Sequence, residues 1–256
     1  MREGRGQERA ITGNRQTSWE FADAYGDELA GDAEGAALHW ARERARQAGL
    51  RSVSPGTGAA LRMLTATVEA KAVAEIGTGT GVSGIHLLAG MRPDGVLTTV
   101  DTEPERQQFA REAFRAAGFL HNGGNGGGTG SGTGAAGGGS GAGNVSSMGN
   151  IGNRVRFIPG RALDVLPRLA DGGYDLVFCD GDRAECLAYL DEALRLLRPG
   201  GLVCFAGVFA ETAGATAQPS EVLRLRELLR TVRESTVLLP SLLPVGDGLL
   251  CAVKRG

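Results

Sequence analysis

The sequence predicts an α/β fold built on a mostly parallel seven-stranded sheet, with helices on both faces and a final antiparallel strand. Two observations carry this prediction. Short apolar runs that suit buried strands alternate with segments whose apolar residues recur every three or four positions, as in amphipathic helices. The last two apolar runs are joined by only the short turn 244–248, which is too short for a parallel crossover, so one of these strands must run antiparallel.

The first two strand–helix units lie between residues 71 and 118. The runs KAVAEIG (71–77) and LTTVD (97–101) are predicted strands. GVSGIHLLAGM (81–91) and EPERQQFAREAFRAAG (103–118) follow them with helical spacing, and Gly118 ends the second helix. This alternation is typical of a parallel sheet whose strands are connected by helices.

The remaining elements surround these two units. The later predicted strands are RVRFI (154–158), YDLVFCD (174–180), GLVCFAG (201–207), ESTVLLP (234–240) and GLLCAVK (248–254). The predicted helices between them are ALDVLPRLA (162–170), AECLAYLDEALRLLRPGG (184–201), which its proline and glycines stop, and SEVLRLRELLRTV (220–232). A further helix over 37–49 precedes the sheet, and the segment 53–70 leads into it.

We expect one domain. Residues 1–36 are predicted to form a polar, partly flexible amino-terminal segment, and residues 37–256 to form the domain itself. Fifteen of the 42 glycines fall between residues 122 and 152. This tract has almost nothing to bury and cannot offset the entropy of ordering itself, so we predict a disordered surface insertion. Apolar patterns on both sides continue one architecture.

Composition narrows the possible partners and location. The 27 basic and 29 acidic side chains nearly balance, which argues against nucleic-acid binding through the overall charge of the protein. No apolar run approaches the roughly 18–20 residues needed to span a bilayer, so we expect no membrane association. The amino terminus lacks the apolar core of a secretory signal, and the four cysteines form no C-x-x-C pair. We therefore predict a cytoplasmic protein with reduced thiols.

Four polar or glycine-rich segments follow the predicted strands. They are EIGTGTGVS (75–83), Asp101, GRAL (160–163) and DGDR (180–183). In an open parallel sheet, ligands bind beyond the carboxyl ends of the strands, close to the point where the strand order reverses. Glycines there allow a tight turn and a close approach of ligand to backbone. An acid in the place of Asp101 can accept hydrogen bonds from both ribose hydroxyls of a nucleoside.

Gly79, Gly81 and Gly84 also satisfy the G-x-G-x-x-G pattern of dinucleotide-binding proteins. Glu75 disfavours that reading, because a carboxylate at this place would repel a pyrophosphate, whereas it would attract the ammonium group of a methionine-derived sulfonium cofactor. In addition, no second mononucleotide-binding half follows. The pattern therefore fits S-adenosylmethionine better than NAD.

At this point the sequence resembles a known family. The segments that carry the resemblance are VSPGTGAALRML, EIGTGTGVSG, LTTVD, GRALDVLPRL, YDLVFCDGDR and LRLLRPGG, between about Val53 and Val253. They are similar to the S-adenosylmethionine-dependent O-methyltransferases related to catechol and caffeoyl-CoA methyltransferases, and most similar to the actinobacterial members of mycobacterial type. The resemblance implies a Rossmann-like methyltransferase fold, S-adenosylmethionine as cofactor, a small-molecule acceptor and a homodimer.

The resemblance also implies roles for individual positions. The residues implied to bind the cofactor are Val53, Glu75, Gly77, Thr78, Ser83, Asp101, Thr102, Ala162 and Asp182. Those implied to be catalytic are Asp180, which would also face the acceptor, Asp182 and Arg183. Arg183 falls where the family commonly has a lysine proposed as general base, yet a guanidinium stays protonated at pH 7. It can still steady an oxyanion, while Asp182 is an alternative base and an acidic acceptor needs none.

A second departure concerns metal binding. Metal-dependent members end the fifth strand in Asp-Asn, and this pair joins the preceding Asp in holding a divalent cation. Here the matching residues are Ala206 and Gly207, which offer no side-chain oxygen. Because Mg²⁺ needs several oxygen ligands, we predict no tightly bound metal. Two alternatives stay open, namely a module that binds S-adenosylmethionine without catalysis and a tRNA methyltransferase.

Overall fold

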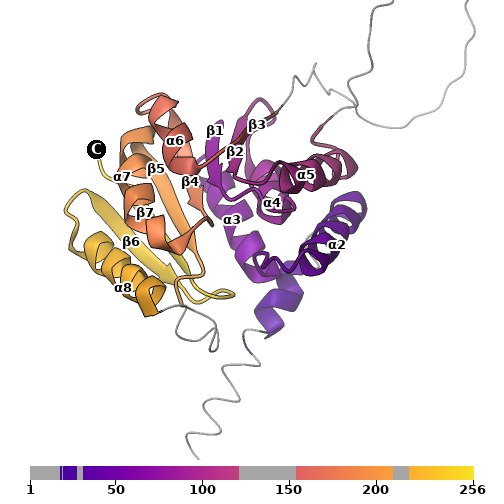
Figure 1. The fold of residues 1–256 in the computed structure, drawn as a ribbon, viewed down its shortest axis with the longest axis horizontal. Coiled ribbons are helices and arrows are strands. Elements are labelled where there is room, and N and C mark those ends of the chain that lie inside the picture. Colours follow the sequence, from indigo (N-terminus) through magenta and orange to yellow (C-terminus); the bar gives the residue numbers. More distant parts are fainter. Residues whose placement is uncertain (1–17, 19, 28–30, 121–153, 210–218) are drawn as a thin grey trace, which may run out of the picture.

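The computed structural model describes residues 18, 20–27, 31–120, 154–209 and 219–256. Its centre is a seven-stranded sheet in the order β3-β2-β1-β4-β5-β7-β6 (Figure 1). The strands are β1 (Ala72–Ile76), β2 (Val96–Asp101), β3 (Val155–Pro159), β4 (Tyr174–Cys179), β5 (Leu197–Ala206), β6 (Leu238–Leu243) and β7 (Leu249–Lys254). All neighbouring pairs are parallel except those of β7, which runs antiparallel to both β5 and β6. The predicted fold class is confirmed.

Helices cover both faces of the sheet (Figure 1). One face carries α2 (Asp32–Gln47), α3 (Pro55–Thr67), α4 (Val82–Gly90) and α5 (Pro104–Ala116), and the other carries α6 (Ala162–Val165), α7 (Cys186–Leu196) and α8 (Pro219–Glu234). Each layer closes its own apolar core against the strands. Short 3₁₀ turns follow α6 (Leu166–Arg168) and β4 (Arg183–Glu185).

The strand order reverses between β1 and β4. The chain runs outward from β1 through β2 to β3 and then returns to the other side of β1 with β4. Backbone hydrogen bonds extend the pairing to the strand ends, from Gly77 N to Val100 O (2.9 Å) and from Asp180 N to Ile76 O (2.8 Å). A ligand crevice is expected at the carboxyl ends of the two strands that flank such a reversal.

Two predicted boundaries are wrong. The helix predicted over 184–201 ends at Leu196, and its proline and glycines belong to the start of β5, where Leu197 pairs with Tyr174 before a register irregularity. The strand predicted over 234–240 begins only at Leu238, because α8 continues to Glu234. The hydrophobic pattern marks the element correctly in each case but does not fix where it starts or stops.

The predicted domain division stays a prediction. Helix α2 begins at Asp32 and continues through residues 36 and 37. The predicted insertion at 122–152 lies outside the described residues. Among the helices that the structure describes, none is long and apolar enough to cross a membrane.

His86, on α4, is buried without a polar partner. It is 3% exposed, and neither ring nitrogen has a hydrogen-bond partner among the described residues. The ring packs on α3 at Gly58, where an added Cβ would lie 2.2 Å from Nε2. Burial, together with the positive charges of Arg42 and Arg62, lowers the pKa of His86 to about 3. The side chain is therefore a neutral packing residue.

We predict that His86→Leu stabilises the protein. Removing two unsatisfied buried nitrogens should add about 1 kcal/mol to the free energy of unfolding at neutral pH. Below the ordinary pKa of 6.5 the unfolded histidine takes up a proton that the folded one refuses until about pH 3, so the wild type loses stability as pH falls through this window. Urea unfolding at pH 7 and pH 5 measures both effects. A variant that is less stable at pH 7 and has the wild-type pH slope would contradict this account.

Candidate functional site

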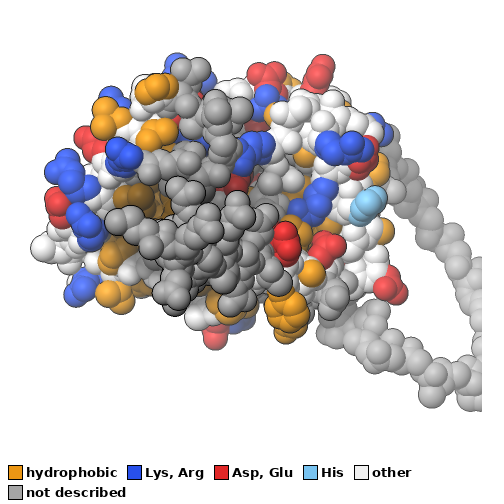
Figure 2. All heavy atoms as spheres, turned by 90° about the horizontal axis from the view of Figure 1, so that it is seen from below, with side chains coloured by type: hydrophobic (Ala, Val, Ile, Leu, Met, Phe, Trp, Pro, Cys, Tyr) orange, Lys and Arg blue, Asp and Glu red, His pale blue; other side chains and the backbone are white. Residues whose placement is uncertain are grey.

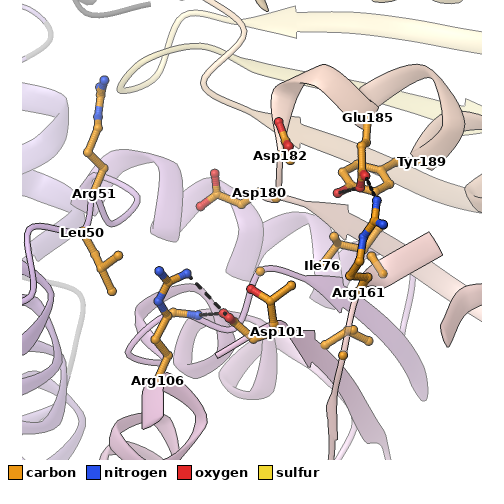
Figure 3. A pocket seen from close by; sticks show the side chains of 17 residues that line it. Leu50, Arg51, Ile76, Asp101, Arg106, Arg161, Asp180, Asp182, Glu185 and Tyr189 are labelled. Atoms are coloured by element: carbon orange, nitrogen blue, oxygen red, sulfur yellow. Dashed lines mark hydrogen bonds and ion pairs between the residues drawn. The ribbon is translucent and has the colours of Figure 1, made fainter. Parts of the chain in front are cut away.

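Three adjacent cavities lie at the carboxyl ends of the strands. The first, of about 470 Å³, lies over the ends of β1, β2 and β4. The second, of about 480 Å³, lies between the segment before α3 and the end of β5. A narrow pocket of about 30 Å³ shares lining residues with both. Arg51 and Asp180 line all three, so they mark the place where the cavities meet. Figure 3 shows both side chains at the first cavity.

The loop between β1 and α4 depends on its glycines. Gly77, Gly79 and Gly81 have φ values of +95°, +50° and +93°, a region that side-chain-bearing residues rarely adopt. At Gly77 an added Cβ would lie 2.5 Å from the backbone oxygen of Asp180. A glycine is therefore required for the ends of β1 and β4 to approach each other, and this approach forms the floor of the first cavity.

Asp101, at the end of β2, fixes the same loop. The residue is 6% exposed, its Oδ2 accepts a hydrogen bond from Gly79 N (2.9 Å), and its Oδ1 accepts one from Glu103 N (3.0 Å). Arg106 forms an ion pair with Oδ1 at 3.6 Å (Figure 3). Each carboxylate oxygen has a second lone pair. Asp101 can therefore hold the loop and still accept hydrogen bonds from a ligand in the first cavity.

Glu75 lies behind the cavity wall. Its side chain is fully buried; Oε1 accepts a hydrogen bond from Ser83 Oγ and Oε2 accepts one from Thr99 Oγ1, both at 2.6 Å. Because Thr99 donates to Glu75, Thr78 Oγ1 donates to Thr99 Oγ1 at 2.7 Å. Burial raises the pKa of Glu75 to about 7, against the opposing effect of the two donated hydroxyls. Glu75 lines none of the three cavities, whereas its hydrogen-bond donor Ser83 and the neighbouring Thr78 line the narrow pocket.

Asp180 and Asp182 follow β4 and differ in their roles. Asp180 is exposed and lines all three cavities. The protein packed around its carboxyl group still reduces the hydration of the charged form, which raises the pKa of Asp180 to about 7. The positive charges of Arg183 and Arg51 oppose this shift. Asp182 lines the first cavity and caps the following 3₁₀ turn, where its Oδ1 accepts a hydrogen bond from Ala184 N (2.9 Å).

The second cavity combines opposite charges. Arg51 forms an ion pair with Asp247. Asp23 accepts hydrogen bonds from Ser54 Oγ and Gly56 N, both at 2.8 Å. The opposite wall holds Arg183 beside the backbone of Ala206 and Gly207. Within the ranges that the structure describes, no three His, Cys, Asp or Glu side chains gather as a metal site would require.

Most of the predicted site residues are brought together. Apart from Glu75, each of them lines at least one of the three cavities: Val53, Gly77, Thr78, Ser83, Asp101, Thr102, Ala162, Asp180, Asp182 and Arg183. Sequence reasoning missed Arg51, Arg106 and Tyr189, which also line the cavities. Arg106 carried a usable signal, because it lies on the helix that directly follows Asp101. Arg51 carried none, because it lies just before the motif that begins at Val53.

Comparisons with known proteins agree with this geometry. A family model described as a methyltransferase domain matches residues 74–206. A candidate O-methyltransferase of Mycobacterium sp. (strain JLS) is 44% identical over 224 residues, which cover 86% of this chain and 87% of that protein. A solved protein from Corynebacterium glutamicum is 28% identical with a TM-score of 0.71, covering 93% and 98% of the two chains. The O-methyltransferase TomG of Streptomyces achromogenes, solved in complex with SAM, is 25% identical with a TM-score of 0.70, covering 94% and 99%.

We predict that Gly77→Ala destabilises the chain much more than Gly79→Ala does. Both positions have positive φ, so each alanine costs about 1 kcal/mol of backbone strain. Only at Gly77 does the new Cβ also meet a backbone atom, whereas nothing lies within 4 Å of a Cβ at Gly79. The clash should add about 1–3 kcal/mol. Urea unfolding of the two variants measures the difference, and equal losses would refute the role assigned to the approach of β1 and β4.

Proposed function

Because the chain belongs to the O-methyltransferase family, we propose that it transfers a methyl group from S-adenosylmethionine to an oxygen of a small-molecule acceptor. The observation that carries the proposal is the meeting of two cavities at Asp180. The first cavity is lined by Asp101 and by the loop between β1 and α4, and the second lies between Asp180 and the end of β5. When bound, S-adenosylmethionine supplies a methyl group activated by a positively charged sulfur.

The first cavity is the proposed cofactor site. Asp101 has lone pairs available for the ribose hydroxyls. Thr102 and Ala162 line the same cavity, where they would lie beside the adenine, with the Ala162 N–H free of an acceptor in its own helix. Gly77, Thr78 and Ser83 would surround the methionine part. When ionised, the buried Glu75 would act on the cofactor through Ser83, which donates a hydrogen bond to it.

The second cavity is the proposed acceptor site, with Val53 at its border with the narrow pocket. The acceptor oxygen must be deprotonated and held in line with the methyl group. Asp180 borders both cavities, and its pKa of about 7 suits a group that takes up a proton near neutral pH. We assign it as the general base and Asp182 as the residue that positions the turn carrying Arg183.

Substituting Asp101 tests the cofactor site. We predict that Asp101→Asn weakens S-adenosylmethionine binding by about tenfold to a hundredfold, because one charged acceptor for the ribose and for Gly79 N is lost. Isothermal titration calorimetry measures this, and NAD should bind neither protein. The exposed Glu112→Gln on α5 is the matched control and should bind normally. Unchanged affinity in Asp101→Asn would remove the ribose role, and a wild type that fails to bind would reject the proposed function.

Substituting Asp180 tests the acceptor site. With a protonatable acceptor, the rate of S-adenosylhomocysteine release should rise about tenfold per pH unit below pH 7 and level off above it, because only the carboxylate accepts a proton. Asp180→Asn should be slower by about 10²–10⁴-fold and should lose this rise. Asp182→Asn should keep it. A wild-type pH profile in Asp180→Asn would show that another group takes the proton.

A second candidate function is a module that binds S-adenosylmethionine without transfer. It is favoured by Arg183, because a guanidinium cannot replace a lysine base. The two functions differ in one result. Release of S-adenosylhomocysteine with any member of a panel of phenols and hydroxamates would reject the non-catalytic module.

We further propose a cytoplasmic homodimer whose partner is a small molecule rather than nucleic acid. The exposed apolar side chains of Leu239 and Leu242 on the edge strand β6, and of Leu223 on α8, support the dimer. On the described part of the face in Figure 2, Lys and Arg side chains are interspersed with acidic and apolar ones, an arrangement that favours a small-molecule partner over nucleic acid. Sedimentation equilibrium with and without tRNA measures both, and a monomeric mass or a tRNA complex would reject the corresponding proposal.

A further inference from the structure

Arg183 points from the end of β4 toward the end of β5. It is the first residue of the 3₁₀ turn Arg183–Glu185, which Asp182 caps. An added Cβ at Gly207 would lie 2.7 Å from Nη2 of Arg183, 3.6 Å from its Cζ and 3.7 Å from its Nε. The guanidinium therefore occupies the space that a side chain at position 207 would take.

Gly207 also has a backbone that suits only glycine. Its φ is +68°. The loop that follows it is held to the β6–β7 turn by hydrogen bonds from Val208 N to Gly248 O (3.3 Å) and from Phe209 N to Asp247 O (2.8 Å). The position is thus fixed by the backbone around it, and any substituent there would have to displace the guanidinium.

The charge of Arg183 is not neutralised by a direct partner. Among the residues that the structure describes, its guanidinium makes no ion pair, and its positive charge acts on Asp180. The other acids of the second cavity are engaged elsewhere or exposed. Asp247 pairs with Arg51, Asp23 accepts two hydrogen bonds, and Glu20 lies exposed at the rim. A positive group thus faces the cavity beside Asp180.

A divalent cation does not fit this position. Ala206 and Gly207 supply no side-chain oxygen, and the described part of the chain offers no cluster of three ligating side chains. A cation between Asp180 and Gly207 would also meet the guanidinium. Since like charges repel strongly at short range, the resident arginine and a bound metal exclude each other here.

On the basis of the proposed function, we propose that the Arg183 guanidinium, which lies in the space that Gly207 leaves open, binds the ionised oxygen of the acceptor. The acceptor is then an acidic hydroxyl compound, such as a phenol or enol with an electron-withdrawing substituent. Gly207 is the specificity-determining residue that admits the guanidinium. A fixed positive charge within about 4–6 Å of such a hydroxyl favours its ionised form by about 1–3 pKa units.

The atoms and charges of the methyl transfer balance without a metal. The acceptor hydroxyl gives its proton to the Asp180 carboxylate or to water, and the oxyanion that remains pairs with Arg183. The oxyanion then forms a bond to the methyl carbon while the carbon–sulfur bond breaks and its electron pair stays on sulfur. One negative and one positive charge are lost together, leaving a neutral ether and a neutral thioether, and Arg183 is released from its anionic partner.

The test uses 4-nitrophenol, whose ionised form absorbs visible light, as a probe of ionisation. The full-length protein is first saturated with S-adenosylhomocysteine and then titrated with the probe from pH 5 to pH 9. We expect the apparent pKa of the bound probe to be lower in the wild type than in Arg183→Met by at least about one pH unit. EDTA should leave it unchanged. Arg156→Met, an exposed residue on β3 outside the cavities, is the matched control and should behave as wild type.

A double-variant cycle tests whether Gly207 acts through Arg183. Gly207→Ala should lose most of the shift by displacing the guanidinium, whereas adding Gly207→Ala to Arg183→Met should change nothing further. Thermal unfolding of each variant checks that it is folded. Additive effects would reject the link between the two residues, and equal probe pKa values in wild type and Arg183→Met, or no probe binding at all, would overturn the inference.

The outcomes separate this inference from the proposed function. If the wild type fails to bind S-adenosylmethionine or S-adenosylhomocysteine, the proposed function fails. If it binds both while the probe ionises equally with and without Arg183, only the role of Arg183 fails. A probe signal that disappears with EDTA and returns with Mg²⁺ would show that a metal supplies the positive charge, and would overturn the inference.

Discussion

The close approach of β1 and β4 at their carboxyl ends is the constraint on which the site depends. Only a residue without Cβ at position 77 lets the backbone of Asp180 come as near as it does. On one side of this contact the chain turns into the glycine loop held by Asp101. On the other side it turns toward Asp182 and Arg183. One backbone contact therefore places the wall proposed to bind the nucleoside next to the charged wall proposed to bind the acceptor.

The buried Glu75 and its hydrogen-bond donors support the cavity wall from behind. Glu75 reaches neither cavity, yet it accepts hydroxyl hydrogen bonds from α4 and β2, and through Thr99 it is linked to Thr78 of the loop. A buried carboxylate without such donors would be very costly. Here it ties a strand, a helix and the loop together, and it keeps a potential negative charge directly behind Ser83. We propose that Glu75 contributes to binding through its position and its charge rather than through direct contact.

The sequence predicted the fold well because its signals are periodic and local. Alternating apolar runs identified all seven strands, and the short last connection required an antiparallel strand. Boundaries were less certain, since the apolar pattern around Leu196 and Leu197 does not show where a helix becomes a strand. Tertiary pairing with Tyr174 decides it.

The site could be predicted to the level of residues but not of contacts. Asp101 and Asp180 follow strands, and strand ends of a parallel sheet meet at one edge, so their proximity was foreseeable. That Glu75 lines none of the cavities and instead accepts hydrogen bonds from Ser83 and Thr99 was not, because the surroundings of one side chain depend on how α4 and β2 pack around it. The packing of the Arg183 guanidinium against Gly207 could not be predicted either, because these residues follow two different strands and no local pattern relates them.

The most direct test of the account is a crystal structure of the protein with S-adenosylhomocysteine. The account predicts electron density across the first cavity, with the ribose hydroxyls on the Asp101 carboxylate and the sulfur beside Asp180 at the opening to the second cavity. Density for the nucleoside in any other place, or with its sulfur turned away from Asp180, would contradict it.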